Sequence, residues 1–119
     1  MEQESLKSTT QILEVQASTD ALTEIPNRRG AMEELLARMY QSRDADYTLS
    51  IAIMDIDHFK AINDTYGHLV GDQVLKELAN VLKGSIRGLD SVSRFGGEEF
   101  LLIFPKTSGE NAVSVCDRI

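Results

Sequence analysis

The sequence is poor in cysteine, in long hydrophobic runs and in positive charge, and each shortage excludes a class of protein. Its single cysteine, Cys116, excludes an intrachain disulfide. No apolar run approaches the roughly 20 residues of a membrane span, and the first residues lack the apolar core of a signal peptide. The 12 Lys and Arg stand against 19 Asp and Glu, a net charge of −7, which argues against nucleic-acid backbones as partners. We therefore predict a cytoplasmic segment without membrane or nucleic-acid contacts.

What is present fits one globular domain. The chain has 119 residues, of which 42% are hydrophobic and 26% charged. Its acidic balance does not argue against a nucleotide substrate, because a triphosphate that arrives with a divalent cation needs carboxylates and only a few local cations. Cys116 falls in an apolar helical pattern and is interpreted as a small core residue.

Residues 1–19 are polar and leave two interpretations open. Leu6, Thr10, Leu13 and Ala17 follow steps of four and three residues, as at the end of a coiled coil. A frayed linker explains the same composition. Pro26 then marks a turn before the next element.

From residue 30 onward, hydrophobic periodicity predicts alternating helices and strands. The expected elements are an amphipathic helix over 30–43, a buried strand over 49–56, a short helix over 59–62, a loop over 65–71, a helix over 72–86, a hairpin of strands 91–95 and 98–104, and a helix from about 110. In the first helix the apolar stripe is Met32, Leu35, Leu36 and Met39. We expect the hairpin to turn tightly at Gly96 and Gly97 with positive φ.

Acidic residues end the buried strand and follow the glycine pair. Alternation places Asp55 and Asp57 on one face, where two carboxylates suit a hard cation such as Mg²⁺. Glu98 or Glu99 can join Asp55 around a metal ion if the hairpin lies beside this strand. The alternatives to a metal site are an acidic strand end that is only solvated, and a structural hairpin flanked by charged residues.

Two pairs of residues and one lysine carry weaker signals. Asn63 and Asp72 flank a glycine-containing loop and suit the edge of a guanine, although Asp72 equally suits the N-cap of the following helix. Arg87 and Asp90 flank a turn that could grip a phosphate and a guanine, or could be a helix-terminal arginine and a turn aspartate. Lys60 is either a triphosphate-binding cation or a surface lysine. The two histidines do not indicate a zinc site.

Together, these motifs resemble one family in order and spacing. Residues 55–64 resemble its DxDxFKxxND motif, residues 67–72 its GHxxGD loop, residues 96–100 the GGEEF form of its signature, and residues 20–29 its DxLTxLxNRR entry. The chain is thereby similar to the GGDEF domain of bacterial diguanylate cyclases.

The resemblance implies an α+β, palm-like βααββαβ core, with an antiparallel-containing sheet flanked by helices. It divides the chain into a helical linker or signalling helix over 1–19 and a GGDEF domain over 20–119. It implies condensation of two GTP into cyclic di-GMP with release of two pyrophosphates, by a homodimer with Mg²⁺ or Mn²⁺. Cyclic di-GMP would also inhibit, and an upstream sensor would lie outside this chain.

The site residues that the resemblance implies fall into four groups. The catalytic residues are Glu98, Glu99 and Asp55, and the metal ligands are Asp55, the Ile56 carbonyl and Glu98. Those for substrate are Asn63, Asp72, Lys60, Gly96 and Gly97. The inhibitory site is Arg87 and Asp90.

The chain also departs from the family pattern. The family's next strand and its downstream Lys and Arg do not occur before Ile119. If the chain were whole, strand 49–56 would have an open hydrophobic edge that invites association. The alternatives to an enzyme are a catalytically silent module that binds GTP or cyclic di-GMP, and a dimerisation fragment.

Overall fold

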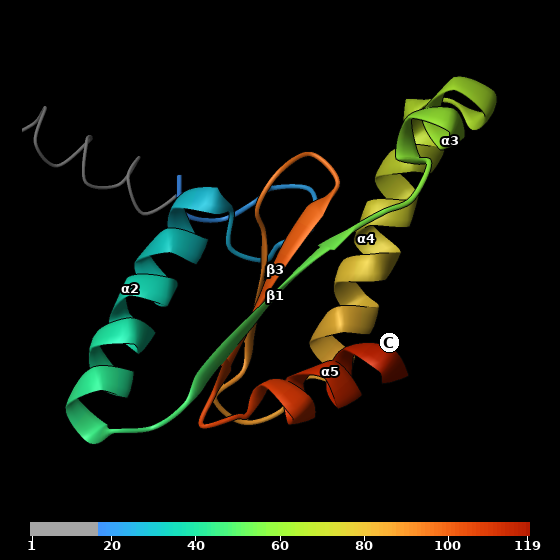
Figure 1. The fold of residues 1–119 in the computed structure, drawn as a ribbon. Coiled ribbons are helices and arrows are strands. Elements are labelled where there is room, and N and C mark those ends of the chain that lie inside the picture. The colour runs from blue at the N-terminus through green and yellow to red at the C-terminus, as the bar shows by residue number, and fades with distance from the viewer. Residues whose placement is uncertain (1–16) are drawn as a thin grey trace, which may run out of the picture.

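The structure, a computed structural model, describes residues 17–119 as a three-stranded sheet with helices on both faces (Figure 1). Helix α2 (Arg28–Ala45) covers one face, and helices α4 (His68–Ser85) and α5 (Gly109–Arg118) cover the other. The elements are α2 Arg28–Ala45, β1 Leu49–Asp55, α3 Phe59–Tyr66, α4 His68–Ser85, β2 Ser91–Arg94, β3 Glu99–Pro105 and α5 Gly109–Arg118. The expected α+β class and element order are therefore confirmed.

The sheet has the order β1-β3-β2 and is antiparallel throughout. Strand β3 is central, and its pairing with β1 runs from Leu49 opposite Pro105 to Asp55 opposite Glu99. Strand β2 leads into β3 as the predicted hairpin. Within the described residues, β1 is an edge strand, as the sequence led us to expect.

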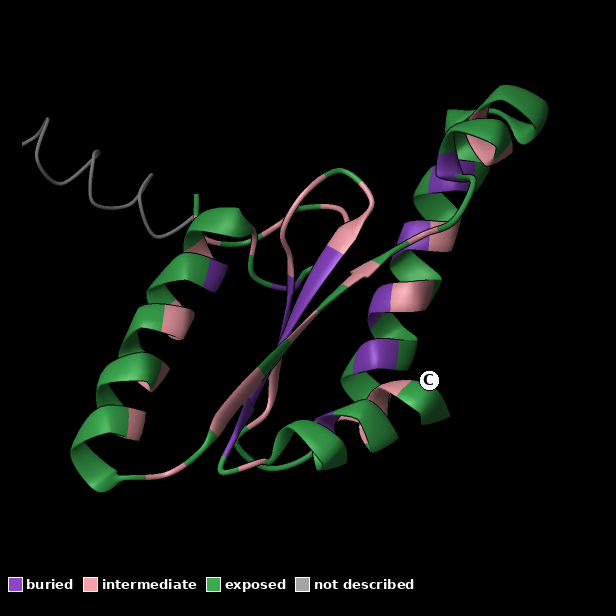
Figure 2. Ribbon diagram, viewed as in Figure 1, coloured by how far each residue is buried: buried purple, intermediate pink, exposed green. Residues whose placement is uncertain are grey.

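The core lies on both faces of β3, which is buried along nearly its whole length (Figure 2). Phe100, Leu102 and Phe104 face α4 and α5, whereas Leu101 and Ile103 face α2. Because successive side chains of a strand point to opposite faces, an unbroken apolar run is what a doubly covered strand requires. Cys116 is half-buried against the α4 side, and burial, aided by Asp117, raises the pKa of its thiol.

The helices around residue 67 differ from the prediction. The expected loop over 65–71 is wrong, because only Gly67, with φ 89°, separates α3 from α4. Asp72 lies inside α4, so its interpretation as an N-cap is also wrong. Gly71 was interpreted as a loop residue, but it lies inside a helix. A glycine is needed there because the Asn63 side chain occupies the space of a Cβ.

The hairpin turn also differs from the prediction. Four residues, 95–98, connect β2 to β3, and neither Gly96 nor Gly97 has a positive φ. A longer connection does not need the left-handed backbone of a two-residue turn. A Cβ at Gly96 would touch the Glu99 carboxylate at 3.4 Å, whereas one at Gly97 would meet open space.

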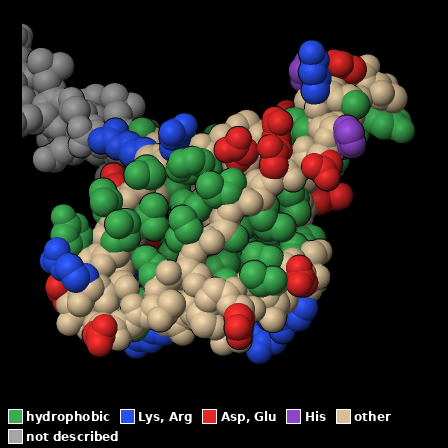
Figure 3. All heavy atoms as spheres, viewed as in Figure 1, with side chains coloured by type: hydrophobic (Ala, Val, Ile, Leu, Met, Phe, Trp, Pro, Cys, Tyr) green, Lys and Arg blue, Asp and Glu red, His purple; other side chains and the backbone are tan. Residues whose placement is uncertain are grey.

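Helix α2 is not oriented as its apolar stripe suggested. It buries Ala31 and packs Leu35 against the sheet, whereas Met32, Leu36 and Met39 are exposed. The reason is its position, since it makes more of its contacts with β2 and β3 than with the edge strand β1. The exposed side chains form an apolar surface over α2 and the adjoining sheet (Figure 3). Ile51 and Ile53 of β1 are exposed as well.

The N-terminal prediction is tested only at its end. Residues 1–16 of the suggested coiled coil or linker lie outside the described residues. Ala17 and Ser18 form a turn, and Thr19 pairs with Pro26 as an isolated β-bridge. Among residues 17–119, no helix combines the length and the apolar character that crossing a membrane requires.

Candidate functional site

A pocket of about 360 Å³ lies between α3, α4 and the hairpin. Five of the predicted substrate or catalytic residues line it, namely Lys60, Asn63, Asp72, Gly97 and Glu98. The other lining residues are Phe59, Asp64, His68, Leu75 and Arg94. Phe59 and Leu75 are buried, so the pocket lining combines apolar side chains with polar groups.

The amide and the carboxylate expected to read a base come from different helices. Asn63 lies on α3 and Asp72 on α4, and the two helices are joined directly at Gly67. The Asn63 side chain lies against Gly71, where any Cβ would collide with its amide oxygen. Close approach of the helices therefore fixes where this amide points.

The predicted metal ligands Asp55, Ile56 and Glu98 lie with Glu99 where the end of β1 adjoins the start of β3. Asp55 at the end of β1 stands opposite Glu99 at the start of β3, so these side chains share a face of the sheet. The Ile56 N–H donates to the Glu98 carbonyl at 3.3 Å, which fastens the hairpin beside the strand. Asp57 lies in the turn after β1, so the alternation argument does not extend to it.

These carboxylates do not form a closed cage. Among residues 17–119, no group of three or more His, Cys, Asp or Glu side chains is arranged to hold a metal ion. Acidic side chains nevertheless gather on the surface where the hairpin turns at the end of the sheet (Figure 3). Asp55 and Gly96 do not line the pocket that contains Glu98.

Arg87 and Asp90 lie in one tight turn at the other end of β2. The Asp90 N–H donates to the Arg87 carbonyl at 3.0 Å, and the Arg87 N–H donates to the Asp90 carboxylate at 3.3 Å. Gly88, with φ 59°, supplies the left-handed residue of the turn. The Asp90 carboxylate thus shapes the backbone, while the Arg87 side chain is exposed.

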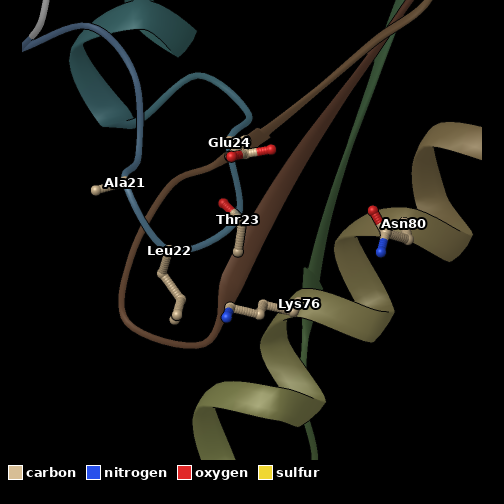
Figure 4. A pocket seen from close by; sticks show the side chains of 6 residues that line it. All are labelled: Ala21, Leu22, Thr23, Glu24, Lys76 and Asn80. Carbon is tan, nitrogen blue, oxygen red and sulfur yellow. The ribbon is translucent and has the colours of Figure 1, made fainter.

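A second pocket, of about 320 Å³, lies between residues 21–24 and α4 (Figure 4). Lys76 and Asn80, one turn apart on α4, face the loop that contains Leu22 and Thr23. None of the predicted site residues lines this pocket, so it is distinct from the site described above.

Sequence reasoning missed an ion pair next to the hairpin. Arg94 donates from Nη1 to the Asp20 carboxylate at 3.1 Å. Burial alone would raise the pKa of Asp20, but hydrogen bonds from Thr23 and the charge of Arg94 outweigh it and hold that pKa below 3.8. The two residues are 74 positions apart, so no periodicity links them. Asp20 is the first residue of the DxLTxLxNRR segment and Arg94 stands two residues before Gly96, but neither position indicates that the two side chains meet.

Comparison with known families decides what this arrangement is. The model of "Diguanylate cyclase, GGDEF domain" matches residues 17–119. The chain belongs to the GGDEF family. This GGDEF domain is 44% identical over 103 residues to diguanylate cyclase DgcP of Pseudomonas aeruginosa. It is 41% identical over 112 residues to diguanylate cyclase A of Treponema denticola.

Solved GGDEF domains have the same fold. The GGDEF domain of DgcB from Caulobacter crescentus, crystallised with c-di-GMP, matches 86% of this chain with a TM-score of 0.82 and 36% identity. The match covers 58% of that chain. The two curated relatives are much longer, since the matches cover 87% and 92% of this chain but only 15% and 30% of theirs.

Proposed function

We propose that this GGDEF domain is the catalytic module of a diguanylate cyclase, which condenses two GTP into cyclic di-GMP and releases two pyrophosphates. The observation that carries the proposal is the pocket that gathers Lys60, Asn63, Asp72, Gly97 and Glu98. These residues come from three separate motifs, and a purely structural role would not need them around one cavity. The family relationship supports the same reaction.

In this proposal, Asn63 and Asp72 select the base. An ionised carboxylate only accepts hydrogen bonds, which suits the two N–H groups on the edge of guanine, and the amide both donates and accepts. Phe59 and Leu75 supply the apolar floor on which the purine lies. Lys60 faces the same pocket and neutralises charge on the triphosphate.

The glycine pair and the acidic residues around it serve the phosphates. Gly97 has no side chain, and apart from its chain neighbours no atom of residues 17–119 lies within 4 Å of where its Cβ would be. The hairpin backbone can therefore approach an anion closely. Asp55, the Ile56 carbonyl and Glu98 are the residues that would hold Mg²⁺ or Mn²⁺. An open set of oxygens suits magnesium, which usually keeps waters and shares its coordination between one or two carboxylates and phosphates. When bound, the metal would stabilise the charge that develops on the phosphoryl oxygens.

The reaction is an in-line phosphoryl transfer. The 3′-oxygen of one GTP forms a bond to the α-phosphorus of the other, and the bond from that phosphorus to the pyrophosphate oxygen breaks. The 3′-hydroxyl proton passes to Glu98, whose carboxylate belongs to the pocket lining. Glu99, opposite Asp55, keeps the local field negative and supports the hairpin. A second round closes the ring.

Three further elements belong to the proposal. Each domain binds one GTP, so two copies face each other as a homodimer. The product, cyclic di-GMP, binds to an inhibitory site at Arg87 and Asp90 and slows the enzyme. The reaction takes place in the cytoplasm, where GTP is available.

The test is product formation by the purified chain with GTP and magnesium, with Glu98→Ala as the variant and Glu110→Ala as a control. Glu110 is an exposed carboxylate in the first turn of α5, away from the pocket. Cyclic di-GMP from the parent and the control, but not from Glu98→Ala, is the expected result. Nucleotide binding without product would favour a silent receptor module, and neither binding nor product would overturn the proposal.

A further inference from the structure

The guanidinium of Arg94 bridges two parts of the chain that are far apart in sequence. Its Nε and Nη2 donate to the Gly97 carbonyl at 3.1 and 2.7 Å. Its Nη1 donates to both carboxylate oxygens of Asp20 at 3.1 and 3.3 Å. One side chain therefore spans the hairpin turn and ties it to the segment before α2.

Asp20 is itself held firmly on the other side. The Thr23 N–H and hydroxyl donate to its carboxylate at 2.9 and 2.6 Å, and Thr23 is buried. The side chains of Asp20 and Arg94 are only 18% and 20% exposed. Charged hydrogen bonds that are shielded from water are stronger and more directional than surface pairs.

Other contacts dock the same segment against the hairpin. The Arg94 N–H donates to the Pro26 carbonyl at 2.8 Å, and Ile25 is buried in the core. The Arg28 guanidinium lies 4.6 Å from the centre of the Phe95 ring. Residues 20–28 thus contact the start of the turn that ends at Glu98.

We propose that Asp20 and Arg94 form a positioning pair, which fixes the Gly97 carbonyl and thereby the place of Glu98 in the pocket. The part played by Glu98 rests on the proposed function. Placement of the segment that enters the domain then sets turnover, because the pair ties this segment to the Gly97 carbonyl of the turn. Arg94 lines the pocket but is a positioning residue, since its charge is matched by Asp20 and its fork is engaged with Gly97.

The first experiment does not depend on catalysis. Amide hydrogen exchange is measured for Phe95 and Gly96, whose N–H groups donate to the Glu99 carbonyl at 2.8 and 3.3 Å. The variants are Asp20→Asn and Arg94→Lys. The matched control is Asp44→Asn, which removes the carboxylate of the exposed Arg43–Asp44 ion pair, 3.2 Å long, in the last turn of α2.

We expect exchange at both hairpin amides to rise about tenfold in the two variants and to stay unchanged in the control, as for a local opening. Amides in the middle of β3 exchange through unfolding of the whole domain, so they report any loss of global stability separately. Unchanged exchange at Phe95 and Gly96 would overturn the positioning pair, whether or not the chain is active.

The second experiment measures turnover with GTP. We expect kcat to fall about 10- to 100-fold in both variants with KM nearly unchanged, since a misplaced catalytic group costs rate rather than binding. The double variant should be no slower than the slower single, because the two residues act as one unit. If Arg94 instead gripped a phosphate, Asp20→Asn would keep kcat while Arg94→Lys raised KM, which would overturn the proposal.

The two experiments separate the two proposals. A parent chain without product contradicts the proposed function, and the exchange result alone then decides whether the pair positions the turn. An active parent whose variants keep full turnover contradicts the positioning pair and leaves the proposed function standing.

Discussion

The amide of Asn63 occupies the space that a side chain at Gly71 would fill. Gly71 is a buried residue inside α4, and an added Cβ would overlap the Asn63 amide oxygen and also approach Phe59 at 3.3 Å. A helix normally loses stability at an internal glycine. Its presence is explained by the neighbouring helix, because only a bare backbone lets the amide of α3 lie there.

Gly71→Ala is therefore expected to weaken GTP binding about tenfold, because it displaces the amide that reads the base. Isothermal titration with GTP and magnesium measures the change. Gly84→Ala is the matched control, since Gly84 lies in the same helix with nothing within 4 Å of an added Cβ. The control should keep its affinity and unfold at an equal or higher temperature. Equal affinity in both variants would contradict this role of Gly71.

Asp72→Asn is expected to reduce the preference for GTP over ITP. Inosine lacks the 2-amino group of guanine, so an acceptor that reads this group favours GTP, and loss of a charged hydrogen bond costs about 10- to 100-fold in affinity. Competition binding of the two nucleotides measures the ratio. Glu77→Gln, on the same helix but outside the pocket, should leave the ratio unchanged. A ratio that survives Asp72→Asn would place the base elsewhere.

Arg87→Ala is expected to raise the concentration of cyclic di-GMP needed for inhibition about tenfold, through loss of a bidentate donor. The initial rate without product should not change, because Arg87 lies at the opposite end of β2 from the hairpin turn. Initial rates at increasing product concentration measure the effect. Asp90 is the less suitable target, since its carboxylate also accepts from the Arg87 N–H and shapes the turn. Unaltered inhibition in Arg87→Ala would refute the proposed inhibitory site.

Ile53→Lys is expected to shift the purified chain toward the monomer by a factor of about ten or more, since burying an isoleucine contributes about 1.5–3 kcal/mol. Ile53 is 59% exposed on the edge strand β1, beside the apolar surface of α2. Sedimentation velocity over a range of concentrations measures the shift. Val113→Lys on α5 changes an equally exposed residue, at 59%, and should have no effect. A parent chain that stays monomeric at every concentration would contradict the expectation.

Asp20→Asn is expected to lower the free energy of unfolding by about 2 kcal/mol at neutral pH, the scale of a hydrogen bond to a charged group. The pKa of Asp20 is lowered in the folded state, so the ionised form stabilises the fold above its ordinary value of 3.8. This contribution is lost as the pH falls from 3.8 through the folded value. Urea unfolding of parent and variant at several pH values should show a difference that shrinks in acid. A difference that is constant with pH would contradict the assignment.

Local patterns were sufficient for much of the fold. Strand β1 and the hairpin were predictable because buried strands carry unbroken apolar runs between turn residues. The same rules failed where a residue is determined by a contact with another element of the fold. Gly71 looked like a loop residue because the sequence does not show that Asn63 needs its space, and Met32 looked like core because α2 could not be placed over β3 in advance.

The sequence predicted which residues belong to the site better than it predicted their relative positions. Motif spacing named five of the ten residues that line the pocket, since each motif carries its functional residues at fixed places. It did not show that Asp55 stands opposite Glu99 while Glu98 faces the pocket. It also missed Asp20 and Arg94, because long-range ion pairs leave no periodic trace.

Strand β2 is so short that an insertion or a deletion within it would disrupt the contacts at its ends. Its four residues, Ser91–Arg94, carry the Arg87–Asp90 turn at one end and the Arg94 anchor at the other. Losing or gaining one residue there would exchange the faces of Val92 and Ser93 and turn Arg94 away from Asp20. A single frame-preserving deletion would thus damage both ends of the strand at once. Length changes should therefore be tolerated in the loops, whereas the spacing from Arg87 to Gly96 should stay constant among sequences that retain both sites.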